Sequence, residues 1–139
     1  MIFHETYQKV LDGTKIQTRR PVNYYRHERL INGIVYRHAT MKEIKKWSVG
    51  NTYAVQPGRG KKSLGKIRIM EIRIEKVQAI SCIDMIAEGL KTNLRHIDAT
   101  MHLLDQWRDL WNSLYAGTKF AWEKNPDVWV LEFELVEKY

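Results

Sequence analysis

The segment from Leu64 to Val77 constrains the fold of this chain more than any other feature. It is long enough for one extended β-strand, and β-branched residues are frequent in it. Its apolar residues begin in one phase and then shift by one position, as Ile67 and Ile69 followed by Met70, Ile72 and Ile74. Successive side chains of a strand point to opposite faces, so a shift of one residue is what a β-bulge produces. The pattern therefore predicts a long strand with a bulge near its middle.

Three other segments are predicted to be strands or hairpins. Residues 128–136 alternate large apolar residues with Glu132 and Glu134, which is typical of a half-buried strand. Residues 29–36 carry Asn-Gly between two apolar pairs, a strong short-range signal for a β-hairpin. Residues 52–55 form a short strand, whereas the polar residues 41–47 are predicted to make a helical turn that leads to Trp47.

Helix signals lie between these strands. Residues 4–12 are predicted to form a short helix that Gly13 ends. Ser81 is predicted to cap a second helix, with Asp84 as its capping-box partner and Gly89 after its end. Residues 98–115 carry one apolar stripe at helical spacing and form the clearest helix. We therefore expect an α+β fold in a single domain, residues 1–139, with a small, mostly antiparallel, barrel-like sheet and flanking helices.

The charge of the chain is unevenly distributed. The net charge is +7, and residues 1–70 hold 15 Lys and Arg against 4 Asp and Glu, whereas residues 71–139 hold 8 against 12. Such asymmetry indicates a basic face for nucleic acid, a nucleotide or another anion. A solvated basic surface without a partner would give the same count.

Several classes of protein do not fit the sequence. No apolar run approaches the roughly 18 residues that span a bilayer, and the start of the chain shows no secretory signal. Cys82 is the single cysteine, so we expect a reducing, cytoplasmic environment and no membrane association. The five histidines show no metal-ligand spacing, and there is no Walker or dinucleotide motif, so neither a metal nor another cofactor is expected.

The segment Lys15 to Arg20 concentrates the residues most suited to chemistry. An amine at Lys15 and a hydroxyl at Thr18 could act as base and nucleophile, and Arg19 and Arg20 could bind an anion. Residues three apart in a regular strand lie on opposite faces, so Lys15 and Thr18 could cooperate only if the backbone bulges or turns there. Alternatively, the three cations contact phosphate, Thr18 holds a turn, and Glu88 pairs with a lysine.

The chain resembles the ASCH domain family over nearly its whole length. The segment Gly13 to Arg20 looks like the family's Gly-x-Lys-x-x-Thr-x-Arg signature. Further similar segments follow in order along the chain, namely Trp47 to Lys61, the strand around Ile67 to Ile74, Ala87 to Gly89, and Val128 to Phe133. The resemblance implies a β-barrel related to the PUA RNA-binding domain. Residues 23–46 are an insertion relative to the small bacterial members.

The resemblance also implies three possible functions. Many members are RNA-binding modules, and some are ribonucleases. One branch removes the acyl group from N4-acetylcytidine and similar nucleosides with a lysine, a threonine and a glutamate, which fall here on Lys15, Thr18 and Glu88. This branch is the leading hypothesis: a metal-independent amidohydrolase acting on a modified nucleoside. A non-catalytic RNA-binding module is the alternative, and a ribonuclease is less favoured because the chain lacks a well-placed histidine pair.

In this hypothesis Thr18 attacks the carbonyl, Lys15 takes its proton, and Glu88 protonates the leaving nitrogen or positions water. Arg20 stabilises the oxyanion or holds the base carbonyl. The candidate substrate-binding residues are Arg19, Arg20, Arg59, Lys61 and Tyr53. The last of these could stack on a base, although its strand also suits it to the core. Arg59 and Lys61 belong to a Gly-rich loop that equally fits a solvated hairpin.

Overall fold

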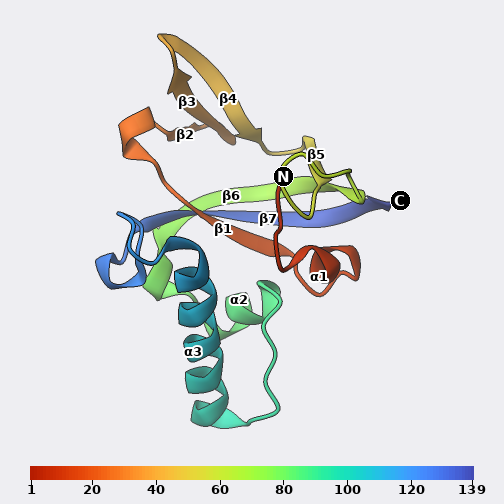
Figure 1. The fold of residues 1–139 in the computed structure, drawn as a ribbon, viewed down its shortest axis with the longest axis vertical. Coiled ribbons are helices and arrows are strands. Elements are labelled where there is room, and N and C mark those ends of the chain that lie inside the picture. The colour runs from red at the N-terminus through yellow and green to blue at the C-terminus, as the bar shows by residue number, and fades with distance from the viewer.

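Two antiparallel sheets and three α-helices make up the molecule, and the larger sheet lies between the helices and the smaller sheet (Figure 1). The computed structural model describes the backbone of residues 1–139 and every side chain except those of His96 and Ile97. The strands are β1 (Gln17–Pro21), β2 (Arg29–Ile31), β3 (Ile34–Ala39), β4 (Lys42–Ser48), β5 (Thr52–Val55), β6 (Gly65–Lys76) and β7 (Asp127–Lys138). The helices are α1 (Tyr7–Leu11), α2 (Cys82–Ala87) and α3 (His96–Tyr115), with 3-10 turns η1 (Tyr24–Arg26), η2 (Val77–Ala79) and η3 (Trp122–Lys124).

The four-stranded sheet has the order β1-β7-β6-β5, so β1 lies at one edge. The long strand β6 pairs with β7 along its whole length, and the register shifts between Ile69 and Glu71. This shift is the bulge that the phase change in the sequence predicted. A second shift, between Lys66 and Ile67, was not predicted. Bulges bend a strand and increase its twist, which curls this sheet toward a half-barrel.

The three-stranded sheet, β2-β3-β4, contains the hairpin predicted at residues 29–36. Asn32 and Gly33 have φ values of 50° and 75°, as a two-residue hairpin turn requires. The predicted helical turn at residues 41–47 is wrong. Thr40 and Met41 make a second turn with positive φ, and the polar residues after it form β4, which pairs with β3.

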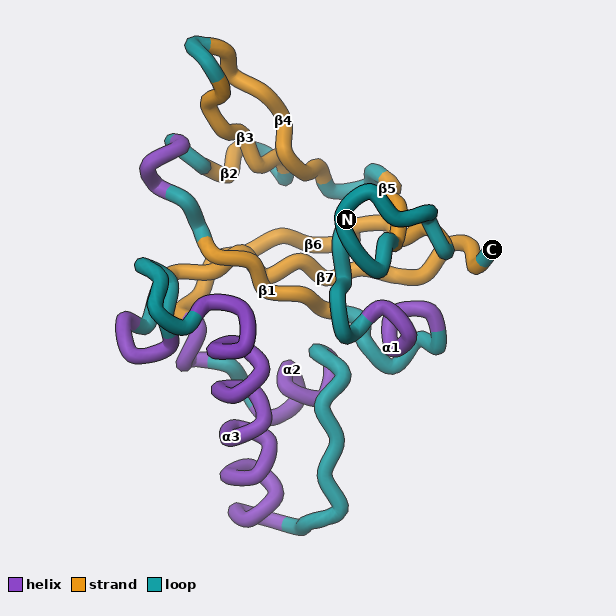
Figure 2. Tube along the Cα trace, in the orientation of Figure 1, coloured by secondary structure: helices purple, strands orange, loops and turns teal.

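Strand β7 separates two parts of the core. Val128 and Val130 pack into a cluster with Trp107 and Trp111 of α3. Side chains from the other face of the same strand, Trp129 and Leu131, pack with residues of the two sheets. The first half of β7 is therefore buried on both faces, whereas the sequence suggested that it is buried on one. Figure 2 shows α2 and α3 together on one side of the strands and the smaller sheet on the other.

The fold is α+β, with a curled, mostly antiparallel sheet and flanking helices, as predicted. Ser81 caps α2 by accepting a hydrogen bond from the Asp84 backbone N–H, and Gly89 ends this helix with a φ of 97°. Within the part of the chain that the structure describes, no helix has the length and hydrophobicity needed to cross a bilayer.

Candidate active site

A cavity of about 610 Å³ lies against the edge strand β1. It is bounded by the N-terminal segment, β1, the end of α2 and the last turns of α3. Its polar wall is formed by Lys15, Thr18, Arg19, Arg20 and Glu88. Its other side is largely apolar and includes Phe3, Trp107, Leu110, Trp111 and Tyr115. The structure thus brings the three predicted catalytic residues to one cavity, although Lys15 and Glu88 are 73 positions apart in sequence.

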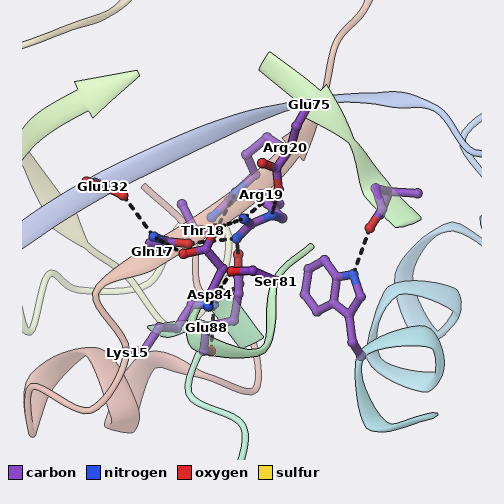
Figure 3. Close-up of polar contacts among 12 residues, drawn as sticks. Lys15, Gln17, Thr18, Arg19, Arg20, Glu75, Ser81, Asp84, Glu88 and Glu132 are labelled. Carbon is purple, nitrogen blue, oxygen red and sulfur yellow. Dashed lines mark hydrogen bonds and ion pairs between the residues drawn. The ribbon is translucent and has the colours of Figure 1, made fainter. Parts of the chain in front are cut away.

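A buried ion pair between Lys15 and Glu88 is the centre of the polar wall (Figure 3). The Lys15 Nζ lies 2.6 Å from the Glu88 Oε1 and donates a second hydrogen bond, of 3.1 Å, to the Glu88 carbonyl oxygen. The side chains are only 4% and 2% exposed. Charges this deeply buried are costly unless each is paired and hydrogen-bonded, and here each is.

Local backbone contacts hold Lys15 in this position. It precedes β1, so the alternation of the strand does not separate it from Thr18. The Lys15 N–H donates to the Lys9 carbonyl of α1, and the Ile16 N–H donates to the Ala87 carbonyl of α2. Lys15 therefore lies in the short segment between the turn at residues 12–14 and β1, and both short helices hold its backbone there.

Arg19 lines the cavity, but its guanidinium N–H groups donate to neighbouring side chains. Its Nη1 donates to the Glu88 Oε2 at 2.9 Å and to the Gln17 Oε1 at 2.9 Å. Its Nε and Nη2 donate to Glu75, and Nη2 also donates to Asp84. All five N–H groups of the guanidinium are thus used, and the side chain is fully buried. Arg19 therefore has no N–H group left for a substrate among these contacts and holds the Glu88 carboxylate in place, so its predicted role in substrate binding stays a prediction.

Further charged and polar side chains surround Arg19, and their contacts were not predicted from the sequence. Asp84, the predicted capping-box partner, turns its carboxylate instead toward Gln17, Arg19 and Arg73. Arg73 also donates to Glu132 of β7, which accepts a further hydrogen bond from Gln17. One of these contacts had a signal in the sequence, namely the two-residue alternation of the strands. Gln17 and Glu132 are cross-strand partners, so their side chains lie on the same face of the sheet.

Thr18 and Arg20 reach the cavity from the other face of β1. Neighbouring strand residues point to opposite faces, but β1 is an edge strand, and the cavity extends around its free edge. The Thr18 Oγ1 accepts a hydrogen bond of 3.3 Å from the Arg20 Nε, and among the described residues it donates none. The Arg20 Nη2 donates to the Ile2 carbonyl at 2.6 Å. No carboxylate among the described residues pairs with Arg20, so this guanidinium retains donors for a ligand.

Burial lowers the pKa of Lys15 from its ordinary value of 10.5, and the positive charges of Arg20 and Arg19 act in the same direction. The Glu88 carboxylate opposes them because its charge and its hydrogen bond favour the protonated amine. The net direction is downward. A lysine amine with a lowered pKa is available as a base at a lower pH than usual.

The remaining predicted substrate-binding residues lie outside this cavity. Arg59 and Lys61 are exposed on the loop after β5 and do not line it. Tyr53 is half-buried on β5, and its hydroxyl accepts a hydrogen bond of 2.7 Å from the Ser48 N–H. Tyr53 packs against the core. It therefore occupies the core position that was the alternative to stacking on a base.

The aromatic wall of the cavity was missed. Trp107 and Trp111 follow core periodicity, and their buried faces also form the cavity side of α3. Tyr115 is the last residue of that helix, where an apolar stripe gives no sign of a site. Among the described side chains, no group of three His, Cys, Asp or Glu is placed to hold a metal ion.

Comparison with solved structures places this geometry in a known fold. An ASCH domain of Lactobacillus crispatus superimposes with a TM-score of 0.54 over 95% of this chain and 70% of its own, at 14% sequence identity. The chain has an ASCH-like fold. A DUF984 protein of Enterococcus faecalis superimposes with a TM-score of 0.64 over 98% of this chain and 69% of its own, at 17% identity. No family model and no curated protein matches the sequence itself. The resemblance expected from the sequence is thus confirmed at the level of the ASCH-like fold.

Proposed function

We propose that this protein is a metal-independent amidohydrolase that removes the acyl group from N4-acylated cytidine or a related modified nucleoside. The observation that carries the proposal is the buried Lys15–Glu88 pair in the wall of a cavity that Thr18 also lines. A volume of about 610 Å³ lies within the range typical of small-molecule sites. An amine, a hydroxyl and a carboxylate are the groups that amide hydrolysis requires.

The proposed reaction begins with attack of the Thr18 Oγ1 on the acyl carbon, while the Lys15 amine accepts the hydroxyl proton. The carbonyl oxygen becomes an oxyanion, which Arg20 stabilises with its free donors. The C–N bond then breaks, and the cytidine nitrogen takes a proton that reaches it through Glu88. Water attacks the acyl-threonine in the second step, which releases the carboxylic acid and restores the hydroxyl.

The apolar side of the cavity suits the planar part of this substrate. Trp107, Trp111 and Tyr115 line the apolar side of the cavity. Aromatic side chains are the usual partners of unstacked nucleobases. This division of the cavity, polar on the β1 side and aromatic on the α3 side, favours a modified nucleoside over a purely aliphatic amide.

A non-catalytic RNA-binding module remains the second candidate, and one observation limits it. Lys15 and Arg19 are paired with buried carboxylates, so they are not free to contact phosphate in this structure. Binding of RNA through the signature segment would therefore depend on Arg20.

Turnover of N4-acetylcytidine by the purified protein tests the proposal, with loss of the acyl group followed by absorbance. We expect Thr18→Ala to lower kcat by at least about a hundredfold, because the nucleophile is lost. Thr18→Ser should retain a measurable part of the activity. Thr14→Ala is the matched control, since Thr14 is an exposed threonine four residues earlier. Full activity in folded Thr18→Ala would remove Thr18 as the nucleophile, and absence of turnover in the parent protein would overturn the amidohydrolase.

A further inference from the structure

A second hollow, of about 530 Å³, adjoins the candidate active site. It lies between the segment 23–47 and the turn after α3, and its wall includes Arg26, Arg37, Lys45, Lys46, Trp47 and Phe120. Arg20 and Tyr115 line both this hollow and the active-site cavity. The two spaces therefore adjoin at Arg20 and Tyr115, which places the second hollow where the continuation of a ligand bound in the first would lie. We call the second hollow the hairpin groove.

The hairpin groove is strongly basic. Its wall contains five Lys and Arg residues, and Glu28 is its one acidic residue among the described side chains. The Glu28 carboxylate is already used, because it accepts hydrogen bonds from the Lys46 Nζ, the Trp129 Nε1 and the Asn23 N–H. Arg26, Arg37 and Lys45 form no ion pair among the described residues, whose pairs in this region are Arg29–Glu43 and Lys46–Glu28. Three cations thus face the groove without a counter-ion.

We propose that the hairpin groove binds backbone phosphates of a single-stranded RNA whose modified cytidine occupies the adjoining cavity, so that the substrate is RNA and not a free nucleoside. This inference rests on the proposed function for the identity of the base in the cavity. A nucleoside carries no phosphate and would leave the groove cations unused. Arginine and lysine side chains are well suited to phosphate oxygens, and such contacts position a nucleic acid without reading its sequence.

Exposed aromatic surface beside the groove favours a nucleic acid over an acidic protein. Tyr25 is 81% exposed, and Lys119 lies 4.1 Å from the centre of its ring. The same lysine lies over the ring of Phe120, which lines the groove. An exposed tyrosine next to a row of cations is the arrangement on which flanking bases of a single strand stack.

The test compares two substrates and two charge-matched variants. The substrates are free N4-acetylcytidine and a short single-stranded oligoribonucleotide with one internal N4-acetylcytidine. The groove variant is Arg26→Gln with Lys45→Gln, two exposed residues whose replacement does not disturb the core. The control variant, Lys62→Gln with Lys138→Gln, removes the same charge from exposed positions that line neither cavity. Affinity for the unmodified oligoribonucleotide is measured separately, against salt concentration.

We expect the parent protein to deacylate the oligoribonucleotide at least about tenfold more efficiently than the nucleoside, because phosphate contacts add affinity. The groove variant should lose most of this preference, and its plot of log affinity against log salt should be shallower by about 1.4, or about 0.7 for each lost phosphate contact. The control variant should keep both the preference and the slope. Equal effects in the two variants, or equal efficiency on the two substrates, would overturn the groove as an RNA site.

The two proposals can fail separately. Salt-dependent RNA binding that only the groove variant weakens, without deacylation of either substrate, would support the groove and reject the amidohydrolase. Deacylation of the nucleoside, with RNA binding unchanged in the groove variant, would support the amidohydrolase and reject the groove.

Discussion

At the scale of single residues, the site is a chain of charges in which each member has a separate task. Lys15 faces the cavity, Glu88 holds Lys15, and Arg19 holds Glu88 through its Nη1. Arg19 is in turn fixed by Glu75 and Asp84. The two residues nearest the cavity can exchange a proton, whereas the outer ones keep them in place. Burial lowers the pKa of Lys15, and the Glu88 carboxylate opposes this shift without reversing it.

The pH dependence of turnover follows from that pKa. If Lys15 is the base, kcat/KM should rise with pH and level off above the pKa of Lys15, with a midpoint below the ordinary 10.5 because burial favours the neutral amine. Replacing Glu88 with Gln removes the charge that opposes this shift, so the residual activity of Glu88→Gln should have its midpoint at a lower pH still. The measurement is kcat/KM across the alkaline range. If the midpoint does not move in Glu88→Gln, the group whose titration controls kcat/KM is not Lys15.

At the scale of elements, the short connections between helices and strands position the site residues as much as the strands do. Gly89, directly after α2, has a φ of 97°, and its carbonyl accepts a hydrogen bond from the Lys9 Nζ. A Cβ at this position would lie 3.0 Å from the Lys9 Cδ and 3.3 Å from the Lys15 Cβ. The backbone at the end of α2 therefore packs closely against the side chains of Lys9 and Lys15.

Gly89→Ala tests this contact. A residue with a side chain is disfavoured at positive φ by about 1–2 kcal/mol, and here the new methyl group would also displace Lys15. We expect a lower melting temperature together with reduced turnover. Gly117→Ala is the control, since Gly117 has a φ of 75° but no atom lies within 4 Å of an added Cβ. It should lose stability and keep its activity. Equal activity losses in both variants would contradict a specific effect on Lys15.

Glu28 connects the smaller sheet to the core. Its carboxylate accepts hydrogen bonds from Lys46 of β4 and Trp129 of β7. We expect Glu28→Ala to lower the free energy of unfolding by about 2 kcal/mol, because a buried charged acceptor and its partners are lost. Glu43→Ala, at an exposed ion pair with Arg29, should cost less than about 1 kcal/mol. Chemical denaturation of the two variants measures the difference.

The contribution of Glu28 should also depend on pH. Burial alone would raise the pKa of its carboxyl, but the hydrogen bonds from Asn23, Lys46 and Trp129 bring it below 4.5. A carboxyl with a lowered folded-state pKa stabilises the protein above its unfolded pKa and loses this effect as the pH falls through the folded-state value. The stability difference between the parent and Glu28→Gln should therefore shrink below pH 4.5.

How far the sequence predicts each element depends on how local its cause is. The Asn32-Gly33 turn and the Ser81 cap were predicted correctly because a few neighbouring residues determine them. The polar strand β4 was missed because its conformation comes from pairing with β3, which composition does not show. In the site, Lys15 and Thr18 were singled out by their residue types within one short segment, and Glu88 was found through the family resemblance. The ion pairs of Arg19 span more than 50 positions and are visible only in the structure.

At the scale of the whole molecule, β7 joins the helical layer to the sheets. Its first half is buried on both faces, so the cluster around α3 and the cluster between the sheets share one strand. We expect the two parts to unfold together, as a single cooperative transition.

Val130→Ala tests this coupling. Val130 packs against α3, and the loss of two buried methyl groups should cost about 2 kcal/mol. Urea unfolding followed by tryptophan fluorescence and by far-UV circular dichroism should give coincident curves, both shifted to lower urea. Val136→Ala, near the exposed end of the same strand, should shift them by less than about 0.5 kcal/mol. Separate transitions for the two probes would show that the layers are independent.

Among the residues that the structure describes, the smaller sheet shares no strand pairing with the larger one, and the proposed catalytic residues lie outside it. Insertions, deletions or exchanges within residues 23–46 can therefore accumulate without altering the reacting groups, provided that the contacts of Val35 and Glu28 with the core are kept. If both proposals hold, the reaction and the choice of substrate are separable traits in evolutionary terms. Remodelling of the hairpin would then change what reaches the cavity and leave the proposed reacting groups in place.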